Sequence, residues 1–233
     1  MDLIDLSTIP DADDRFVRFL DDVCQTLEFD HASYATFNPI SGAVQGFANY
    51  SADWVTHYMT RGFHRIDPTI HISRKSIAPV DWDRLERTTH FQTVFANAPD
   101  FHVSERGLTV PVRGPYGDIG LFSVTRNCPA TQWQSLRKHV MGNLQMAAVH
   151  MHDNVMGSNL SMSALRLPSL SQREREILQW VAEGKSQQDI GDILSISHRT
   201  VEVHLRSARS KLGALSTPQA VGRAVGLGIV KPS

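Results

Sequence analysis

The segment from Lys185 to Leu212 constrains the fold more than any other part of the chain. It holds two patterns of helical periodicity, separated only by the short turn Ser195–Ser197. The second pattern places its apolar residues on one helix face: Val201, Leu205, Ala208 and Leu212. Its other positions are mainly Arg, Lys, Thr and Glu, side chains that the major groove of DNA accepts. The pattern predicts a helix-turn-helix, although a charged outer face also occurs in ordinary helical bundles.

Charge divides the chain unevenly. From Leu170 to the end there are 9 Lys and Arg against 6 Asp and Glu, whereas the first 169 residues hold 14 and 18. The net charges are therefore +3 and −4, which predicts that any nucleic acid binds to the C-terminal part. We expect one domain at 1–156, a Ser-rich linker at 157–169, and a helical second domain at 170–233.

The first domain alternates between helical and strand patterns. Helical periodicity occurs at 16–27, 51–61, 90–97 and 133–155. Strand patterns occur at 32–37, 43–50, 108–113 and 118–126, and short turns join them in pairs. The expected fold class is α+β, with an N-terminal α-β-α sandwich around an antiparallel sheet and a C-terminal all-α, four-helix helix-turn-helix domain.

The last helical pattern of the first domain is longer than one small domain needs. Its apolar stripe continues through Leu144, Ala147, Met151 and Val155. We therefore expect the C-terminal part of this stripe to face the same helix of a second copy, in a two-fold homodimer.

Several classes of protein are not expected. Cys24 and Cys128 are the only cysteines, which excludes a disulfide framework and a cysteine-based zinc site. The chain lacks the run of about 18 apolar residues that a membrane span needs, and its N-terminus is acidic, unlike a signal peptide. The histidines show no metal-ligand spacing, and no catalytic nucleophile arrangement stands out. We expect a cytoplasmic protein that is not an enzyme, with no metal, no cofactor and no membrane partner.

The C-terminal part resembles the DNA-binding domain of the LuxR family. The matching positions include Arg173-Glu174, Trp180, Gly184-Lys185, Ile196-Ser197, Thr200-Val201 and Lys211-Leu212. The resemblance implies that Glu202 and Arg206 read bases in double-stranded DNA. The side chains better placed for phosphates are Lys185, Arg199, Thr200, Arg209 and Lys211, with His204 a weaker candidate. The alternative for Glu202 is an i,i+4 ion pair that only orients Arg206.

The N-terminal part decides which kind of LuxR-type protein this is. A phosphorylated receiver domain would present paired acids at the end of its first strand, but Asp21-Asp22 lie inside a helical pattern. The chain instead resembles the autoinducer-binding domain of quorum-sensing LuxR proteins. That resemblance rests on Tyr50, Trp54, Tyr58, Asp67-Pro68, Pro79 and Trp82, and on the later Gly107–Pro111 and Gly120.

The resemblance implies an N-acyl homoserine lactone as the effector. Trp supplies only a donor, Tyr a donor or an acceptor, and ionised Asp only acceptors, which suits the carbonyls and amide N–H of such a ligand. By resemblance, Trp54 donates to the lactone carbonyl, Tyr50 donates to the amide carbonyl, and Asp67 accepts from the amide N–H. Tyr58 and Trp82 wall the ring and the start of the acyl chain, and Thr125 adds a hydroxyl near the amide. The alternative is that the aromatic residues, Tyr58 above all, only fill a core.

The expected function is a ligand-responsive transcriptional regulator that binds an inverted-repeat site as a homodimer. Two rivals remain. A lactone hydrolase tethered to DNA would need a metal or nucleophile constellation. A DNA-binding module whose first domain only dimerises would leave Asp67 without a purpose.

Overall fold

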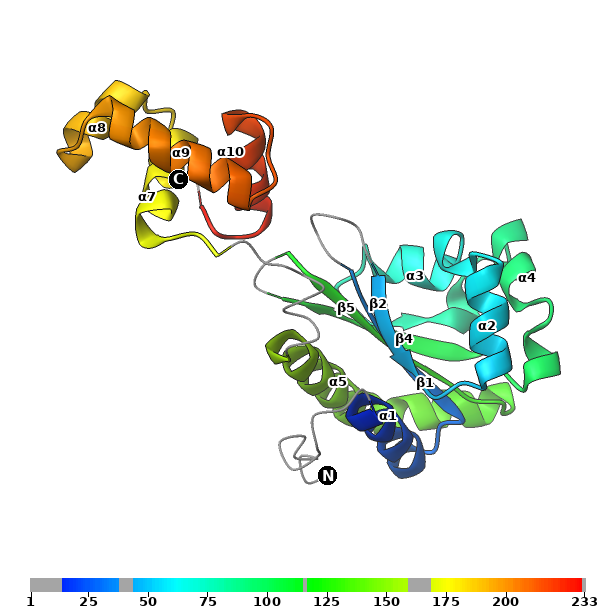
Figure 1. The fold of residues 1–233 in the computed structure, drawn as a ribbon. Helices are drawn as coiled ribbons and strands as arrows, with labels where there is room; N and C mark the ends of the chain where they lie inside the picture. Colours follow the sequence, from blue (N-terminus) through cyan, green and yellow to red (C-terminus); the bar gives the residue numbers. More distant parts are fainter. Residues whose placement is uncertain (1–13, 38–43, 115–116, 159–168, 232–233) are drawn as a thin grey trace. The chain divides into compact units, whose positions relative to one another are not determined.

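The computed structural model describes residues 14–37, 44–114, 117–158 and 169–231, which form two compact units. The first unit contains, in order, α1 (Asp14–Leu27), β1 (His31–Phe37), β2 (Val44–Ala48), α2 (Ala52–Thr60), η2 (Phe63–Arg65), α3 (Pro68–Ser73), β3 (Val80–Asp81), η3 (Trp82–Arg84), α4 (Thr89–Phe95), η4 (Ala98–Phe101), β4 (Gly107–Arg113), β5 (Ile119–Thr125) and α5 (Ala130–Gly157) (Figure 1).

The strands form one antiparallel sheet in the order β2-β1-β5-β4-β3. The expected pairs β1–β2 and β4–β5 are present, but the segment around Pro79 and Trp82 is not simply a loop. It adds the short edge strand β3, in which Val80 pairs with Thr109 and Asp81 with Leu108. A run of two residues is too short for a sequence pattern to reveal.

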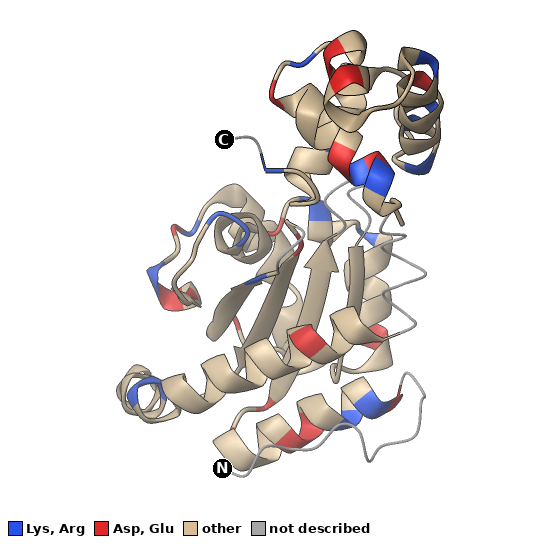
Figure 2. Cartoon of the chain, turned by 90° about the vertical axis from the view of Figure 1, so that its left-hand side faces the viewer, with Lys and Arg blue, Asp and Glu red and all other residues tan. Residues whose placement is uncertain are grey.

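Helices cover both faces of the sheet, which confirms the α-β-α sandwich. Helices α1 and α5 lie on one face, and α2, α3 and α4 lie on the other (Figures 1 and 2). Alternation along β5 separates the two sides: Phe122 and Val124 join the α1/α5 core, so Ser123 and Thr125 point to the opposite face. The second face therefore receives hydroxyl groups from the sheet itself.

The apolar stripe of α5 packs inside its own domain. Leu144, Ala147, Met151 and Val155 are between 0 and 4% exposed and belong to the core formed with α1 and the sheet. The expectation that this stripe faces a second copy is wrong, because these side chains are already buried in the core of their own domain. The large apolar side chains that α5 leaves exposed are Met146 and Val149.

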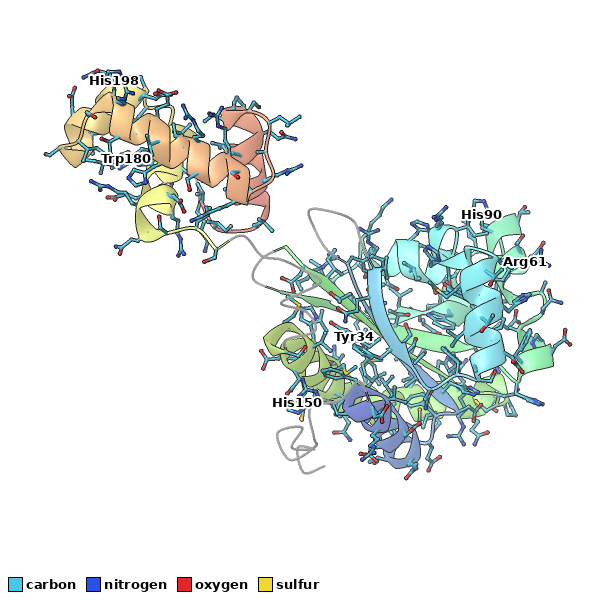
Figure 3. The ribbon with its side chains drawn as sticks, in the orientation of Figure 1. Tyr34, Arg61, His90, His150, Trp180 and His198 are labelled. Carbon is cyan, nitrogen blue, oxygen red and sulfur yellow. The ribbon has the colours of Figure 1, made fainter. Side chains whose placement is uncertain are left out.

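One buried hydrogen bond ties α5 to the centre of the sheet. The Tyr34 hydroxyl on β1 lies 2.7 Å from His152 Nδ1 (Tyr34 is labelled in Figure 3). Gly120 on β5 makes room for this contact, since a Cβ there would lie 2.4 Å from His152 Nδ1. The glycine is therefore required by packing against the imidazole rather than by a turn.

The second unit contains α7 (Gln172–Ala182), α8 (Gln187–Leu194), α9 (His198–Lys211) and α10 (Thr217–Gly226), as the sequence predicts. A serine side chain accepts a hydrogen bond from the first turn of each helix: Ser171, Ser186, Ser197 and Ser216. The predicted inward edge of α9 is buried in the apolar core of this unit.

Helix α5 continues to Gly157, the first residue of the predicted linker. Residues 159–168, which make up most of that linker, lie outside the described residues, so the domain boundaries stay a prediction. Within the described residues, none of the helices has the length and apolar character to cross a membrane.

Substitution of Gly120 by Ala should destabilise the first domain by about 1–3 kcal/mol, because the new methyl group overlaps the His152 ring. Gly142, on α5, has nothing within 4 Å of an added Cβ, so Gly142→Ala should stabilise the domain by about 0.5–1 kcal/mol. Urea unfolding of the full chain, followed by tryptophan fluorescence, measures both changes. Equal effects of the two substitutions would contradict the packing assigned to Gly120.

Candidate functional site

Asp67 is the centre of a polar cluster on the α2/α3 side of the sheet. Its carboxylate is 4% exposed and is the N-cap of α3. Asp67 Oδ1 accepts from the Thr69 amide at 2.8 Å and from Thr69 Oγ1 at 2.7 Å, and Oδ2 accepts from the Tyr58 hydroxyl at 2.7 Å. Burial raises the pKa of Asp67, against the lowering effect of these donors.

The cluster leaves Asp67 able to accept one more hydrogen bond. A carboxylate has about four acceptor positions, and Tyr58 and Thr69 supply three donors. The Tyr58 hydroxyl is committed to Asp67, and burial, followed by the nearby carboxylate charge, raises the pKa of Tyr58 well above its usual value. Tyr58 therefore positions Asp67 as well as lining the site.

A second group of hydroxyls gathers around Tyr50, between β2 and α2. Burial of its hydroxyl raises the pKa of Tyr50 to about 12, and the hydroxyls of Ser33 and Thr125 partly offset this rise. The oxygen Thr125 Oγ1 is fully buried and has no hydrogen bond of normal geometry within the described residues. The contact with Tyr50 leaves the hydrogen bonding of this buried hydroxyl incomplete, which costs free energy, so the position favours a ligand group that completes it.

Aromatic side chains enclose the space beside these polar groups. Trp54, on α2, is almost fully buried and lies 5.9 Å from the Tyr58 ring and 5.4 Å from the Phe101 ring. No described residue accepts a hydrogen bond from Trp54 Nε1. The indole is therefore an available donor at the edge of an apolar cluster that includes Phe63 and Trp82.

The Trp82 ring can line the ligand site, but its indole N–H is not available to a ligand. Its Nε1 donates to Thr109 Oγ1 at 2.9 Å, and Thr109 Oγ1 lies 2.9 Å from Ser123 Oγ. The indole lies directly against Gly107, where a Cβ would come within 2.5 Å of the ring. The hydrogen bond and the bare glycine fix the indole flat against β4.

The structure thus brings Tyr50, Trp54, Tyr58, Asp67, Trp82 and Thr125 to the same side of the sheet. Sequence reasoning did not find three residues that support them: Ser33, Thr69 and Thr109. Thr69 could have been found, because a Thr two residues after an Asp-Pro helix start is placed to bond the capping carboxylate. Ser33 and Thr109 depend on strand register, which the sequence leaves open.

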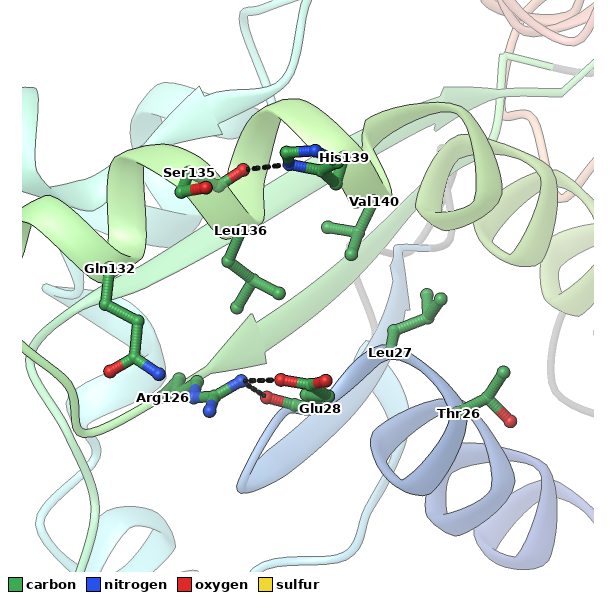
Figure 4. Close-up of a pocket in the computed structure, with 9 residues that line it drawn as sticks. All are labelled: Thr26, Leu27, Glu28, Arg126, Gln132, Ser135, Leu136, His139 and Val140. Atoms are coloured by element: carbon green, nitrogen blue, oxygen red, sulfur yellow. Dashed lines mark hydrogen bonds and ion pairs between the residues drawn. The ribbon is translucent and has the colours of Figure 1, made fainter.

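A separate groove lies between α1 and the first turns of α5, with a volume of about 310 Å³ (Figure 4). Leu27, Leu136 and Val140 provide its apolar part. Its guanidinium group, from Arg126, already bonds the Glu28 carbonyl at 2.5 Å and the Glu28 carboxylate at 2.9 Å. Because this charge is neutralised within the protein, the groove is a weaker candidate for ligand binding than the Asp67 cluster.

The helix-turn-helix depends on a close approach between α8 and the turn. A Cβ at Gly191 would lie 2.8 Å from the Ile196 carbonyl oxygen, and Ser195 has the left-handed φ of 54° that ends α8. The buried edge of α9 then leaves Glu202, Val203 and Arg206 outward, with Arg206 71% exposed. Acidic and basic residues are both present on the helices of this unit (Figure 2).

Glu202 and Arg206 form the ion pair that sequence spacing allows, at 3.4 Å. Both side chains remain largely exposed, so this pair does not prevent either from contacting a base. Val203 was not singled out from the sequence, yet it is 57% exposed on the same outward side of α9. An apolar side chain at this place can contact the methyl group of thymine.

Lys211 has a structural partner. Its Nζ lies 2.8 Å from the buried Glu174 carboxylate, which also accepts from Ser207 Oγ and from the Ser171 amide. Burial alone would raise the pKa of Glu174, but these donors outweigh it and lower the pKa to about 2. Lys211 thus fixes the end of α9 to α7 and still exposes part of its side chain.

Within the described residues, no group of His, Cys, Asp or Glu side chains is arranged to hold a metal ion. The polar groups that remain available are hydrogen-bond donors and acceptors around an aromatic space, and an exposed helix face that suits the major groove. The fold and these two sites define a two-domain regulator that binds a small molecule with one domain and DNA with the other.

Comparison with known proteins agrees with this class. Residues 13–155 match the family described as autoinducer binding domain, and residues 168–224 match bacterial regulatory proteins of the luxR family. The transcriptional activator RaiR of Rhizobium etli is 36% identical over 171 residues, which cover 73% of this chain and 71% of RaiR. The transcriptional activator SolR of Ralstonia nicotianae is 30% identical, with 93% and 92% covered.

Among solved structures, Escherichia coli SdiA has a similar fold, with a TM-score of 0.73 and 24% identity, over 96% of this chain and 94% of SdiA. A complex of SdiA with octanoyl-rac-glycerol gives a TM-score of 0.75, also at 24% identity, over 98% and 93%. The chain belongs to the LuxR family of transcriptional regulators and carries its autoinducer-binding and DNA-binding domains.

Proposed function

We propose that this regulator binds an N-acyl homoserine lactone at the Asp67 cluster and, as a homodimer, binds an inverted-repeat DNA site. The observation that carries the ligand assignment is the buried Asp67 carboxylate with one acceptor position left. An amide N–H beside an aromatic space meets that need. Trp54 and Tyr50 then donate to the lactone and amide carbonyls, and Thr125 adds a hydroxyl near the amide. Tyr58 and Trp82 enclose the ring and the first carbons of the acyl chain.

The DNA assignment rests on the outward face of α9. Arg206 suits guanine O6 and N7, and Glu202 can accept from cytosine N4. Arg199, Arg209, Lys185 and His204 are placed for phosphates, which provide affinity without sequence choice. Thr200 and Lys211 take part in this set while also holding the helix, through Ser197 and Glu174 respectively.

The homodimer is assigned to the outward face of α5. Met146 and Val149 are one helical turn apart and are 47% and 57% exposed. Large apolar side chains that gather on one outer helix face favour contact with another protein surface. Pairing two copies through this face would present two DNA-binding domains to two half-sites of an inverted repeat.

For the ligand site, Asp67→Asn should weaken binding of N-octanoyl homoserine lactone about ten- to a hundredfold, because a charge-assisted hydrogen bond is worth about 1.5–3 kcal/mol. Trp54→Phe should cause a smaller loss, since it removes one donor and keeps an aromatic ring. Isothermal titration calorimetry of the full chain measures both. The control ligand is the ester analogue of this lactone, in which an oxygen atom replaces the amide N–H.

The ester should bind the native protein weakly and should lose no further affinity in the Asp67→Asn variant. If the ester and the amide respond alike to that substitution, Asp67 does not accept the amide proton. If Asp67→Asn and Trp54→Phe both bind the lactone with native affinity, the ligand does not bind at the Asp67 cluster.

For DNA reading, Arg206→Ala should cost about 1–3 kcal/mol on the specific site and flatten the preference at one base pair per half-site. Arg209→Ala should weaken binding to all sequences alike and reduce the salt slope by about one for each phosphate that is no longer neutralised. Lys211 does not suit this comparison, because its removal leaves the buried Glu174 unpaired. Titrations of operators with single-base changes separate the two classes.

The role of Glu202 is resolved in the same titrations. Glu202→Gln should alter preference at a different base pair from Arg206→Ala if it reads cytosine. A change confined to the Arg206 base pair would leave Glu202 with the ion pair alone. An Arg206→Ala protein that discriminates as well as the parent would remove Arg206 from base reading.

For assembly, Met146→Glu should shift the protein towards monomers, since it places a charge on the proposed apolar contact. Met59→Glu is the matched control, because Met59 is 57% exposed on α2 and lies outside that face. Sedimentation velocity of both proteins gives the result. A dimer of undiminished stability in Met146→Glu would place the interface elsewhere.

A further inference from the structure

Asp81, on the edge strand β3, is a buried carboxylate that contacts α5 through Trp133 and Arg137 and also lies 4.0 Å from the exposed Arg84 guanidinium of η3. Its side chain is 9% exposed. Asp81 Oδ1 accepts from Trp133 Nε1 at 3.2 Å, and Oδ2 forms an ion pair with the Arg137 guanidinium. Trp133 and Arg137 are four residues apart and therefore share one face of α5. The edge strand is thus attached to α5 through one carboxylate.

The next residue, Trp82, belongs to the other side of the sheet. Asp81 pairs with Leu108, whose side chain is in the α1/α5 core, so Asp81 points to the same side. Trp82 instead packs among the aromatic residues of the ligand site and bonds Thr109. Two consecutive residues therefore contact the two opposite helical layers of the domain.

This attachment is difficult to break. Separating the carboxylate from Trp133 and Arg137 would leave a nearly buried charge with only the Asp83 amide and the exposed Arg84 guanidinium, 4.0 Å away, as partners, which is costly. Asp81 Oδ1 also accepts from the Asp83 amide at 3.3 Å and so caps the short helix η3 that carries Trp82. A displacement of the Trp82 segment is therefore easier if Trp133 and Arg137 move with it.

We propose that Asp81 is a positioning residue that couples the Trp82 wall of the ligand site to α5. The inference rests on the proposed function in two respects: an acyl homoserine lactone is named as what displaces Trp82, and α5 is taken as the helix of assembly. Because α5 also carries Met146 and Val149, the coupling links the wall of the site to the helix assigned to assembly. Coupling of this kind is reciprocal: a displacement of Trp82 affects α5, and a displacement of α5 affects Trp82.

The test uses the full chain labelled with 5-fluorotryptophan, which gives one fluorine resonance for each of its 4 Trp residues. Single Trp→Phe variants assign the resonances. The wall is first disturbed without any ligand by Thr109→Val, which removes the acceptor of Trp82 Nε1. The Trp133 resonance should shift in this variant and should stay in place when Thr109→Val is made in an Asp81→Asn background. Arg137→Met leaves the bond from Trp133 Nε1 to Asp81 Oδ1 in place, so the Trp133 response should be retained in that background.

The matched control is Glu28→Gln, which removes the carboxylate from the other ion pair near the start of α5. In that background the Trp133 response to Thr109→Val should persist. An unchanged Trp133 resonance in Thr109→Val, or an equal shift with and without Asp81, overturns the proposal. If the Trp133 response is also lost in the Glu28→Gln background, the loss reflects a general loosening of the domain. That result also overturns the proposal.

A second arm adds N-octanoyl homoserine lactone to the native protein and to Asp81→Asn. The Trp54 and Trp82 resonances should shift in both proteins, and the Trp133 resonance only in the native one. A shift of Trp133 in both proteins overturns the coupling. If no Trp resonance of the first domain moves at saturating ligand, the proposed ligand is wrong, and the Thr109→Val comparison still decides the coupling.

Discussion

The two-sided sheet is the constraint on which the rest of the first domain depends. Along β5, Phe122 and Val124 enter the α1/α5 core, whereas Ser123 and Thr125 face the opposite layer. A shift of one residue in register would exchange these sets and bury hydroxyl groups in an apolar core. The α1/α5 side therefore holds the larger apolar core, while the other side keeps hydroxyl and carboxylate groups beside an aromatic cluster.

On that second side, the groups that we propose to bind the ligand also stabilise the fold. Asp67 begins α3 and holds Thr69 and Tyr58, so its position does not depend on a ligand. A carboxylate that is already oriented loses little conformational entropy when it accepts one more hydrogen bond. Trp82 is fixed in a comparable way by Thr109 and by the bare surface of Gly107.

The sequence was sufficient for local patterns and insufficient for contacts between distant segments. The antiparallel hairpins and the inward edge of α9 follow from spacing, and both are present. The α5 stripe was assigned to the wrong neighbour, because periodicity shows which face is apolar but not what covers it. Strand β3 and the Glu174–Lys211 pair were missed, since each depends on residues brought together only by the fold.

The buried carboxylates at the two sites differ in how they hold their charge. Donors lower the pKa of Glu174 to about 2, so its support of α9 is fully present above the ordinary glutamate pKa near 4.5 and is lost only as the pH falls towards 2. Burial instead raises the pKa of Asp67, because the ionised carboxylate loses hydration in this position. A donor from a ligand would favour the ionised form and lower that pKa again. At the proposed ligand site, binding and ionisation of Asp67 would therefore reinforce each other, whereas the support that Glu174 gives to α9 does not change in the pH range above 4.5.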